Sequence, residues 1–409
     1  MGFAVITMPI PIVQVDVARI TELVVAKSVE GSRVWVEVSR EGQVVGIVEM
    51  MTRDGRISAN DIRQRIEDLE AVAPSTRVDF PMEELPRMSV VVPTICKNPL
   101  RLKSTIDRLM SLNYPSFDII VVDNRPDPNR SPLPDFESDS RVHVFWEPHR
   151  GVSAARNCGF GNATGDFVAF TDDDAEVDVN WLLEMGLRFV ANPTVDGIGG
   201  LVLPMELRTA PQLWFEEFFG GFNQSFSAEL MSMELLADDP LFPYATGRYG
   251  AGVNMAIRRS AFIEIGGFDE TLGVGTPSRG GEDLSLFMRL VLSGGTVAFE
   301  PRAVVRHQHR ETETEFFDQV FGYGTGLTAM FTALIISDPR HVPKMIRRLP
   351  RAFRLLTEPR DERSPSSRAS YPRRTYTYHL LGMAYGPIAY ARSVVRTRRE
   401  RSSRTAFSR

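Results

Sequence analysis

Cysteine is almost absent from this sequence. Its 409 residues include only Cys96 and Cys158, which are too few for a disulfide framework and do not stand at a spacing typical of metal ligands. A small disulfide-stabilised secreted scaffold is therefore excluded. We expect both cysteines to be packing residues in a protein that stays in a reducing compartment.

Long apolar runs are also missing. The start, MGFAVITMPIPIVQVDVARI, lacks a basic segment and contains acidic and proline residues where a signal peptide needs an unbroken apolar stretch. The longest apolar run near the end covers 327–336, well short of the roughly 20 residues of a membrane-spanning helix. These absences argue against secretion and against a transmembrane segment, and they predict a cytoplasmic location.

The sequence does contain enough apolar material for a large core, because 43% of its residues are hydrophobic. Its charge is uneven: residues 338–409 contain 18 Lys and Arg against 5 Asp and Glu, although the whole chain has a net charge of −5. An acidic body without a nucleic-acid motif argues against a nucleic-acid partner. The basic segment, with interleaved aromatic and apolar residues, predicts a peripheral contact with an anionic membrane at the inner face of the cell membrane.

Residues 1–86 predict an accessory α+β module and linker. Val34, Val36 and Val38 alternate before a turn at 40–43 and a second apolar run, which is typical of a β-hairpin. Ser58, followed three residues later by Asp61, predicts the start of a helix that reaches position 69. We assign this module no chemistry.

From residue 89 onward, short β-rich runs alternate with helical stretches. The runs are SVVVPT, FDIIVVDN, VHVFWE and DFVAFTDDD, with helices expected near 100–112, between the second and third runs, and near 153–160. This alternation predicts a Rossmann-like, largely parallel sheet with flanking helices. Ligands bind such sheets beyond the carboxyl ends of the strands. Three polar clusters fall there: Pro93-Thr94, Asp123-Asn124 and 172–174.

The run GDFVAFTDDD ends in three consecutive carboxylates. Such a group repels itself unless a cation lies among its members. Because alternate side chains of an extended segment point the same way, Asp172 and Asp174 can face one ion while Asp173 faces elsewhere. Carboxylate oxygens suit Mg²⁺ or Mn²⁺, and these ions often bind the phosphate groups of a substrate at the same time. The alternative is an acidic solvated loop.

Several other candidates each have a structural alternative. Arg156 lies on a short predicted helix between Gly151 and Gly159, where it could cradle a diphosphate or simply face solvent. Asp123 could bind a base or ribose, or cap a turn.

Glu282 and Asp283 open a predicted helix behind two glycines that would admit a substrate. Acids also favour helix N-termini through the helix dipole, which is the structural alternative. His307 and His309 follow a strand-like run and could be metal ligands or structural residues. The aromatic-rich segment 204–249 is either a lid on the acceptor side or an ordinary packed insert.

Together these segments resemble the inverting family 2 glycosyltransferases, which have the GT-A fold. The matching pieces span about 89–325 and occur in the family's order: VVPT, VVDN, GVSAARNCG, GDFVAFTDDD, GAGVNMAIRRSAFIEIGGFDE, GGEDLSLFMRL and VVRHQH. Each piece is a weak signal, whereas seven in order are specific. Within this family, the sequence resembles bacterial galactofuranosyl- and rhamnosyl-type transferases.

The resemblance implies a role for each matched residue. Pro93, Thr94, Asp123, Arg156, Asp172 and Asp173 would bind the nucleotide-sugar. Asp172, Asp174 and His307 would hold Mn²⁺ or Mg²⁺, and the 24-residue step from Asp283 favours His307 over His309. Asp283 would be the catalytic base and Glu282 would bind the acceptor. The first block, PTICKN, departs from many relatives, which weakens the assignment of base-binding residues.

The sequence thus predicts a three-part enzyme: a module at 1–86, a GT-A catalytic domain at 87–325 and a helical basic region at 326–409. It would transfer a sugar from a UDP, dTDP or GDP donor to a glycan, lipid-linked or small-molecule acceptor, in the synthesis of cell-surface glycans or glycosylated metabolites. It could also form a homo-oligomer. The alternatives are a non-catalytic sugar-nucleotide or glycan-binding protein, and a nucleotidyltransferase, whose glycine-rich loop is missing after the first strand.

Overall fold

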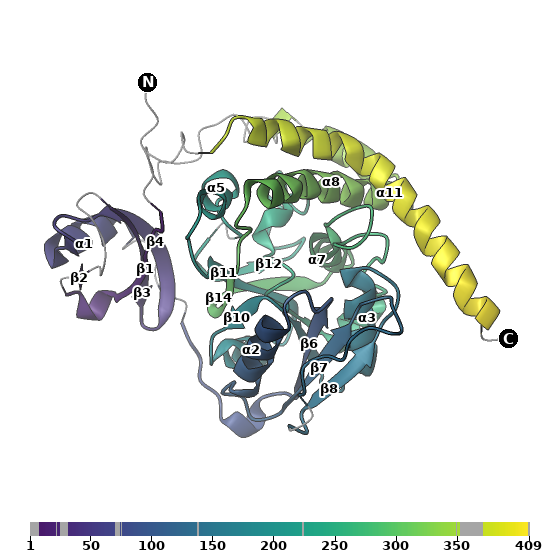
Figure 1. The fold of residues 1–409 in the computed structure, drawn as a ribbon, viewed down its shortest axis with the longest axis horizontal. Helices are drawn as coiled ribbons and strands as arrows, with labels where there is room; N and C mark the ends of the chain where they lie inside the picture. Colours follow the sequence, from purple (N-terminus) through teal and green to yellow (C-terminus); the bar gives the residue numbers. More distant parts are fainter. Residues whose placement is uncertain are drawn as a thin grey trace.

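The computed structural model describes residues 8–21, 23–24, 32–69, 74, 76–136, 139–222, 225–348, 350–351 and 371–407. Part of the basic segment that was predicted to touch a membrane, residues 352–370 and 408–409, lies outside these ranges. The described chain forms sheets of three, nine and two strands. Figure 1 shows the small N-terminal sheet beside a larger α/β body, with two long helices along the top of the view.

The N-terminal sheet is built on the predicted hairpin. Strands β3 (Arg33–Arg40) and β4 (Gln43–Met51) pair antiparallel, and β1 (Ile12–Asp16) adds parallel to β3. Glu41 and Gly42 between the hairpin strands have φ values of 51° and 75°. Two successive residues in the left-handed region give a turn whose twist matches that of the strands. The short strands β2 (Leu23–Val24) and β5 (Arg56–Ile57) form the two-stranded sheet.

This part of the chain buries a hydrophobic cluster of its own. The alternating valines of β3 point into it, and α1 (Ala59–Ile66) covers it with Ile62 and Ile66. The predicted helix start is confirmed, because the Asp61 backbone N–H donates to the Ser58 hydroxyl oxygen at 3.0 Å.

The nine-stranded sheet has the order β10-β14-β11-β13-β9-β6-β7-β8, with β12 paired to β14. Its strands are β6 (Met88–Thr94), β7 (Phe117–Asp123), β8 (Val142–Trp146), β9 (Phe167–Phe170), β10 (Ala175–Val177), β11 (Val195–Pro204), β12 (Glu229–Met231), β13 (Met255–Arg258) and β14 (Thr296–His307). Strands β9, β6, β7 and β8 run parallel, as predicted. Strands β10, β12 and β13 pair antiparallel with their neighbours, so the whole sheet is mixed.

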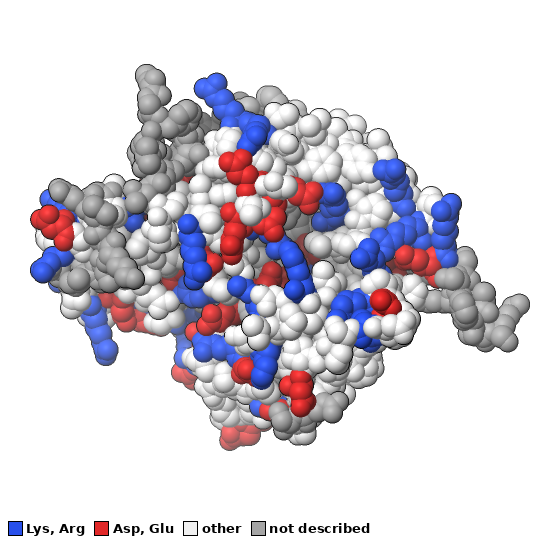
Figure 2. All heavy atoms as spheres, in the orientation of Figure 1, with Lys and Arg blue, Asp and Glu red and all other residues white. Residues whose placement is uncertain are grey.

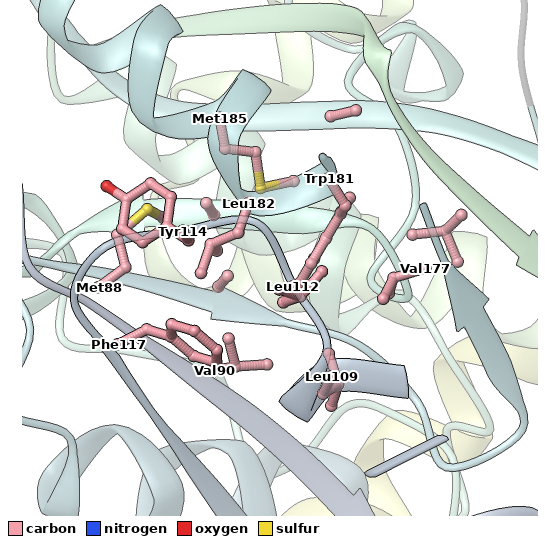
Figure 3. Close-up of a cluster of buried hydrophobic side chains, with 14 of the residues drawn as sticks. Met88, Val90, Leu109, Leu112, Tyr114, Phe117, Val177, Trp181, Leu182 and Met185 are labelled. Carbon is pink, nitrogen blue, oxygen red and sulfur yellow. The ribbon is translucent and has the colours of Figure 1, made fainter. Parts of the chain in front are cut away.

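Helices cover both faces of this sheet. The described helices after β6 are α2 (Pro99–Met110), α3 (Val152–Asn162), α4 (Trp181–Ala191), α5 (Ala210–Phe219), α6 (Arg259–Glu264), α7 (Glu282–Leu292), α8 (Glu313–Ser337), α9 (His341–Ile346) and α11 (Arg374–Phe407). Of these, α2, α3, α4, α6 and α7 lie directly against strands of the sheet. On one face, α2 and α4 close a core in which Trp181 and Leu109 meet Val90 of β6 (Figure 3). On the other face, side chains of α3, α6 and α7 pack around Phe170 and Phe287.

The helix expected between β7 and β8 was a wrong prediction. The described residues of 124–141 run through turns and irregular backbone. Proline has no backbone N–H and disfavours helical geometry in the residue before it. This segment contains four prolines: Pro126, Pro128, Pro132 and Pro134.

The segment 204–249 folds onto the body. Helix α5 lies against α8, and β12 extends the sheet by pairing with β14. Arg248, near the end of this segment, forms ion pairs with Glu229 and Asp239 in its middle.

Helix α8 crosses the predicted boundary at position 325 without a break. Among the helices of the described residues, only α8 is long and apolar enough to cross a membrane, and half of its most apolar window is buried inside the protein. A core helix meets the same criterion. Helix α11 packs along α8 and then extends past the body to the C-terminus (Figure 1).

Buried charges join the N-terminal sheet to the body. The Arg306 guanidinium in β14 donates to both carboxylate oxygens of Glu37 in β3, at 2.7 and 2.5 Å. A second contact places Arg33 between Glu49 and Glu217, and the Glu217 side chain on α5 is only 4% exposed. Burial raises the pKa of Glu217 to about 7, against the opposing effect of Arg33.

We expect this contact to make stability depend on pH. The pKa of Glu217 rises from 4.5 to about 7 on folding, so the folded state binds the extra proton. Its stabilising effect is full below about pH 4.5 and is lost as the pH rises through about 7, by on the order of 1–3 kcal/mol. Calorimetry across this range should show a steeper loss of stability for the wild type than for Glu217→Gln. Parallel curves for the two proteins would contradict the prediction.

Candidate active site

The polar clusters at the strand ends lie at one edge of the sheet. Thr94, at the end of β6, pairs with Asp123, at the end of β7. Strand β9 is the other parallel neighbour of β6, with Val91 opposite Phe170, so the acids that follow β9 emerge beside Thr94. This grouping is the one that the sequence pattern predicted.

Asp172, Asp174 and His307 form a cluster. One possible ligand atom from each lies within 4.8 Å of the other two, and no other metal-ligand group of this kind occurs in the described ranges. Sheet pairing brings the residues together, because β10 runs antiparallel to β14 with Ala175 opposite His307. Asp174 therefore lies beside the imidazole, and its Oδ1 is 3.3 Å from His307 Nε2.

Two carboxylates and an imidazole fit a divalent cation. Oxygen ligands suit Mg²⁺ and Mn²⁺, and an added imidazole is accepted by many first-row metals. Within the part of the chain that the structure describes, the buried Nδ1 atom of His307 has no hydrogen-bond partner. The cluster can thus hold Mn²⁺ or Mg²⁺, and the donor set does not select one of the two ions.

The negative charge of Asp174 and the positive charge of His307 stabilise each other. Burial raises the pKa of Asp174, but His307, Arg310 and Arg101 outweigh this effect and lower it to about 2. Burial disfavours the His307 imidazolium, whereas the neighbouring Asp174 carboxylate favours it, and the net pKa of His307 is raised. A bound cation would replace this proton, since a ligand imidazole must be neutral.

Asp173 faces away from this cluster, as the alternation of side chains predicts. Its carboxylate accepts a hydrogen bond from the Thr94 hydroxyl, which itself accepts one from the Cys96 backbone N–H at 2.8 Å. Burial raises the pKa of Asp173 to about 6. The pair Thr94–Asp173 thereby joins the end of β6 to the acidic loop.

Arg156 lies beneath the site and does not line it. Its side chain is 3% exposed and donates to Asp172 Oδ1 at 3.0 Å and to Glu282 Oε1 at 2.9 Å. A third bond, at 3.2 Å, goes to the carbonyl oxygen of Gly252. The predicted contact of Arg156 with a nucleotide remains a prediction, while its hydrogen bonds here hold the carboxylates of Asp172 and Glu282 in place.

Glu282 and Asp283 differ in their accessibility. Glu282 is 6% exposed and pairs with Arg156; its burial, followed by the nearby Asp283 carboxylate, raises its pKa to about 7. Asp283 is only partly buried, and its Oδ2 accepts a hydrogen bond from the Gly252 backbone N–H at 2.7 Å. Asp283 is therefore the acid of this pair that an acceptor can reach more easily.

Asp123 is engaged by two arginines. Arg125 donates to both of its carboxylate oxygens, at 2.9 and 2.8 Å, and Arg130 donates to Oδ2 at 2.5 Å. Burial opposes ionisation, but the two arginines prevail and lower the pKa of Asp123. The guanidinium of Arg130 also lies 4.3 Å from the ring centre of Trp146. Pro93 is buried within the end of β6.

Sequence reasoning missed three residues beside the acids. Arg101 and Arg310 both act on Asp174. Tyr323 of α8 lies near the other acids: burial raises its pKa, and the charges of Asp283 and Glu282 raise it further. Arginines after a strand or on a helix carry no distinctive pattern, so no sequence signal singled them out. His309 lies apart from the metal-ligand cluster, with its Nε2 2.5 Å from Glu216 Oε1.

Comparison with known proteins gives one family match. Residues 89–266 match the model of glycosyl transferase family 2. The chain is 31% identical over 244 residues to the pre-mycofactocin glycosyltransferase of Mycobacterium tuberculosis, covering 58% of this chain and 46% of that one. It is 31% identical over 217 residues to the succinoglycan biosynthesis protein ExoM of Rhizobium meliloti, covering 50% and 62%.

The glucosyl-dolichyl phosphate glucuronosyltransferase of Haloferax volcanii is 27% identical over 243 residues, covering 58% of this chain and 73% of that one. The chain thus spans less than half of the first of these relatives, 46%, and 62% of the second. Among solved structures, a mannosyltransferase from Pyrobaculum calidifontis in complex with GDP-Man and Mn²⁺ aligns with a TM-score of 0.47 at 19% identity, covering 78% of this chain and 88% of that one.

Proposed function

We propose that this protein transfers a sugar from a nucleoside diphosphate donor to a hydroxyl group of an acceptor, because residues 89–266 match the model of glycosyl transferase family 2. The observation that carries the proposal is a continuous set of contacts between the possible metal ligands and an accessible base. Arg156 binds Asp172 and the Gly252 carbonyl, and the Gly252 N–H binds Asp283. Residues 87–325 would carry the chemistry, with 1–86 as an accessory module and 326–409 as a helical basic region.

The donor diphosphate would lie at Asp172, Asp174 and His307. Bound there, Mn²⁺ or Mg²⁺ would supply charge stabilisation to the departing diphosphate. Arg101 and Arg310 add positive charge at the same side of Asp174, where they would neutralise further phosphate oxygens. Asp173 would stay with Thr94 and shape the loop around the sugar.

The nucleoside would bind at the ends of β6 and β7, near Pro93, Thr94 and Asp123. Asp123 is only 2% exposed and both its oxygens are held by arginine. A ribose or base that hydrogen-bonds to Asp123 would therefore have to displace one arginine. Arg130 is the candidate for displacement, because its single bond to Asp123 is easier to exchange than the two-point contact of Arg125.

Asp283 would act as the base that deprotonates the acceptor hydroxyl. A hydroxyl is a poor nucleophile until a positioned carboxylate takes its proton. The Gly252 N–H fixes Asp283 Oδ2, while the partial exposure of the side chain admits the acceptor. Attack from the face opposite the diphosphate inverts the anomeric carbon. Glu282, buried against Arg156, would support this geometry and reach the acceptor less readily than predicted.

The acceptor class is less narrowly defined than the reaction. The names of three relatives point to pre-mycofactocin, to succinoglycan and to glucosyl-dolichyl phosphate. We accordingly propose a glycan, lipid-linked or small-molecule acceptor, used in the synthesis of cell-surface glycans or glycosylated metabolites in the cytoplasm.

A donor screen tests the proposed function. The purified full chain is incubated with Mn²⁺ and sugars linked to UDP, dTDP or GDP, and the release of free nucleoside diphosphate is measured. We expect slow release from one donor through transfer to water, because the metal-ligand cluster and the base are both in place. Thermal stabilisation by the matching diphosphate should accompany it. Neither release nor stabilisation with any of these nucleotides would contradict the proposal.

A further inference from the structure

The outer face of α11 is apolar along most of its described length. Leu381, Ile388 and Val395 are 56%, 57% and 50% exposed and lie seven residues apart, which places them on one side of the helix. Leu380 extends the same surface, with 61% exposure. We call these four side chains the α11 outer face.

The fold does not need this surface, because the opposite side of α11 already packs on α8. Side chains could not be added at Gly324, Gly382 or Gly386 without meeting the other helix, so the two backbones approach closely. Pro387 cannot donate a backbone hydrogen bond. The Thr328 hydroxyl on α8 instead donates to the carbonyl oxygen of Met383, four residues before that proline, at 2.7 Å.

Arginines flank the apolar stretch on both sides. Residues 371–407 contain eight arginines and a single acid, Glu400, and no charged residue lies between Arg374 and Arg392. Arg373, Arg398 and Arg399 are exposed. In Figure 2, blue side chains gather where α11 leaves the body at the right of the view. An apolar strip with cationic ends matches the interface of an anionic bilayer, where arginine reaches the headgroups while apolar side chains enter the acyl boundary.

We propose that the α11 outer face docks on the surface of an anionic lipid bilayer, with the helix lying in the plane of the interface. The composition of segment 338–409 predicts a membrane contact for the segment as a whole. The proposal assigns that contact to the side chains of the α11 outer face. A second copy of the chain suits this face less well. Pairing two such helices would bring two arginine-rich segments together with only one acid on each to offset them.

Docking would hold the acids of the site near the membrane. The Ser278 hydroxyl lies 3.0 Å from that of Ser393 on α11, and Arg396 donates to the carbonyl oxygens of Gly275 and Arg150 at 2.8 and 3.0 Å. These contacts fasten α11 to the loop that precedes Glu282. If the proposed function is correct, an acceptor carried by a membrane lipid would approach Asp283 from this side.

Vesicle flotation tests the docking without any reaction. The full chain is mixed with vesicles of phosphatidylcholine and phosphatidylglycerol, or of phosphatidylcholine alone, at low and high salt. We expect recovery with the anionic vesicles only, weakened by salt. The double variant Leu381→Glu with Ile388→Glu should bind at least about tenfold more weakly, since two apolar side chains are lost from the contact. Both positions are exposed, and circular dichroism and calorimetry verify that the variant folds.

The matched control is Ile263→Glu on α6, where an equally exposed isoleucine, at 64%, lies outside the α11 outer face. It should float as the wild type does. Equal recovery of the wild type from neutral and anionic vesicles would overturn the proposal, as would unchanged binding of the double variant. Light scattering tests whether this face binds a second copy of the chain instead. If the wild type is a dimer, the double variant is a monomer and neither protein binds lipid, the α11 outer face is a dimer interface and the proposal is overturned.

Discussion

Replacing Asp283 by asparagine should lower the rate of sugar transfer by about 10²-fold to 10⁴-fold, the usual contribution of a general base. Asparagine keeps the shape of the side chain and can still accept the hydrogen bond that the Gly252 N–H donates to Asp283. It cannot take a proton from the acceptor hydroxyl. Donor binding should change little, because the possible metal ligands lie on other strands and loops. The measurement is turnover together with the affinity for the donor, determined separately.

Glu282→Gln is the comparison for this prediction. It alters the neighbouring carboxylate, which is buried against Arg156 at 2.9 Å. We expect it to lower thermal stability, because the buried guanidinium loses a charged partner, and to reduce turnover less than Asp283→Asn does. If Asp283→Asn kept most of its turnover while Glu282→Gln lost it, the base would be Glu282.

Much of the fold could be predicted where local pattern and structure agree. The alternation of Val34, Val36 and Val38 identified the hairpin, and the apolar runs that end at Thr94 and Asp123 identified two neighbouring parallel strands. Polar residues directly after such strands meet at one edge of a sheet. For that reason the sequence alone predicts the grouping of the candidate site and shows the resemblance to family 2.

Other features depend on contacts between distant parts of the chain. The approach of His307 to Asp174 follows from the antiparallel pairing of β10 with β14; no local pattern encodes it, and only the family resemblance implied it. The ion pair between Arg306 and Glu37 joins residues 269 positions apart. The burial of Arg156 could not be predicted either, because a short helix with one arginine is compatible with both a surface and a buried position.

The wrong helix between β7 and β8 has a different cause. Four prolines in this segment disfavour a helix, but the prediction followed the alternation of strands and helices and gave the prolines too little weight. The irregular segment has a consequence for the site, since it supplies Arg125 and Arg130, which both bind Asp123.

The second large effect concerns the possible metal ligands. Asp174→Asn removes a charge that faces His307 at 3.3 Å, and it should lower transfer by more than about a hundredfold, because a catalytic metal ion contributes several kcal/mol. Unlike Asp283→Asn, it should also weaken metal-dependent donor binding. Asp107→Asn is a suitable control, since that carboxylate pairs with Lys103 on the surface of α2.

The most direct test is a titration of the EDTA-treated full chain with Mn²⁺ and with Mg²⁺, following the release of nucleoside diphosphate from the donor that the screen identifies. We predict no release before the metal is added, saturable recovery in the wild type and in Asp107→Asn, and a lost or strongly weakened response in Asp174→Asn. Full activity of the wild type in EDTA would contradict the account and leave Asp172 and Asp174 with a structural role.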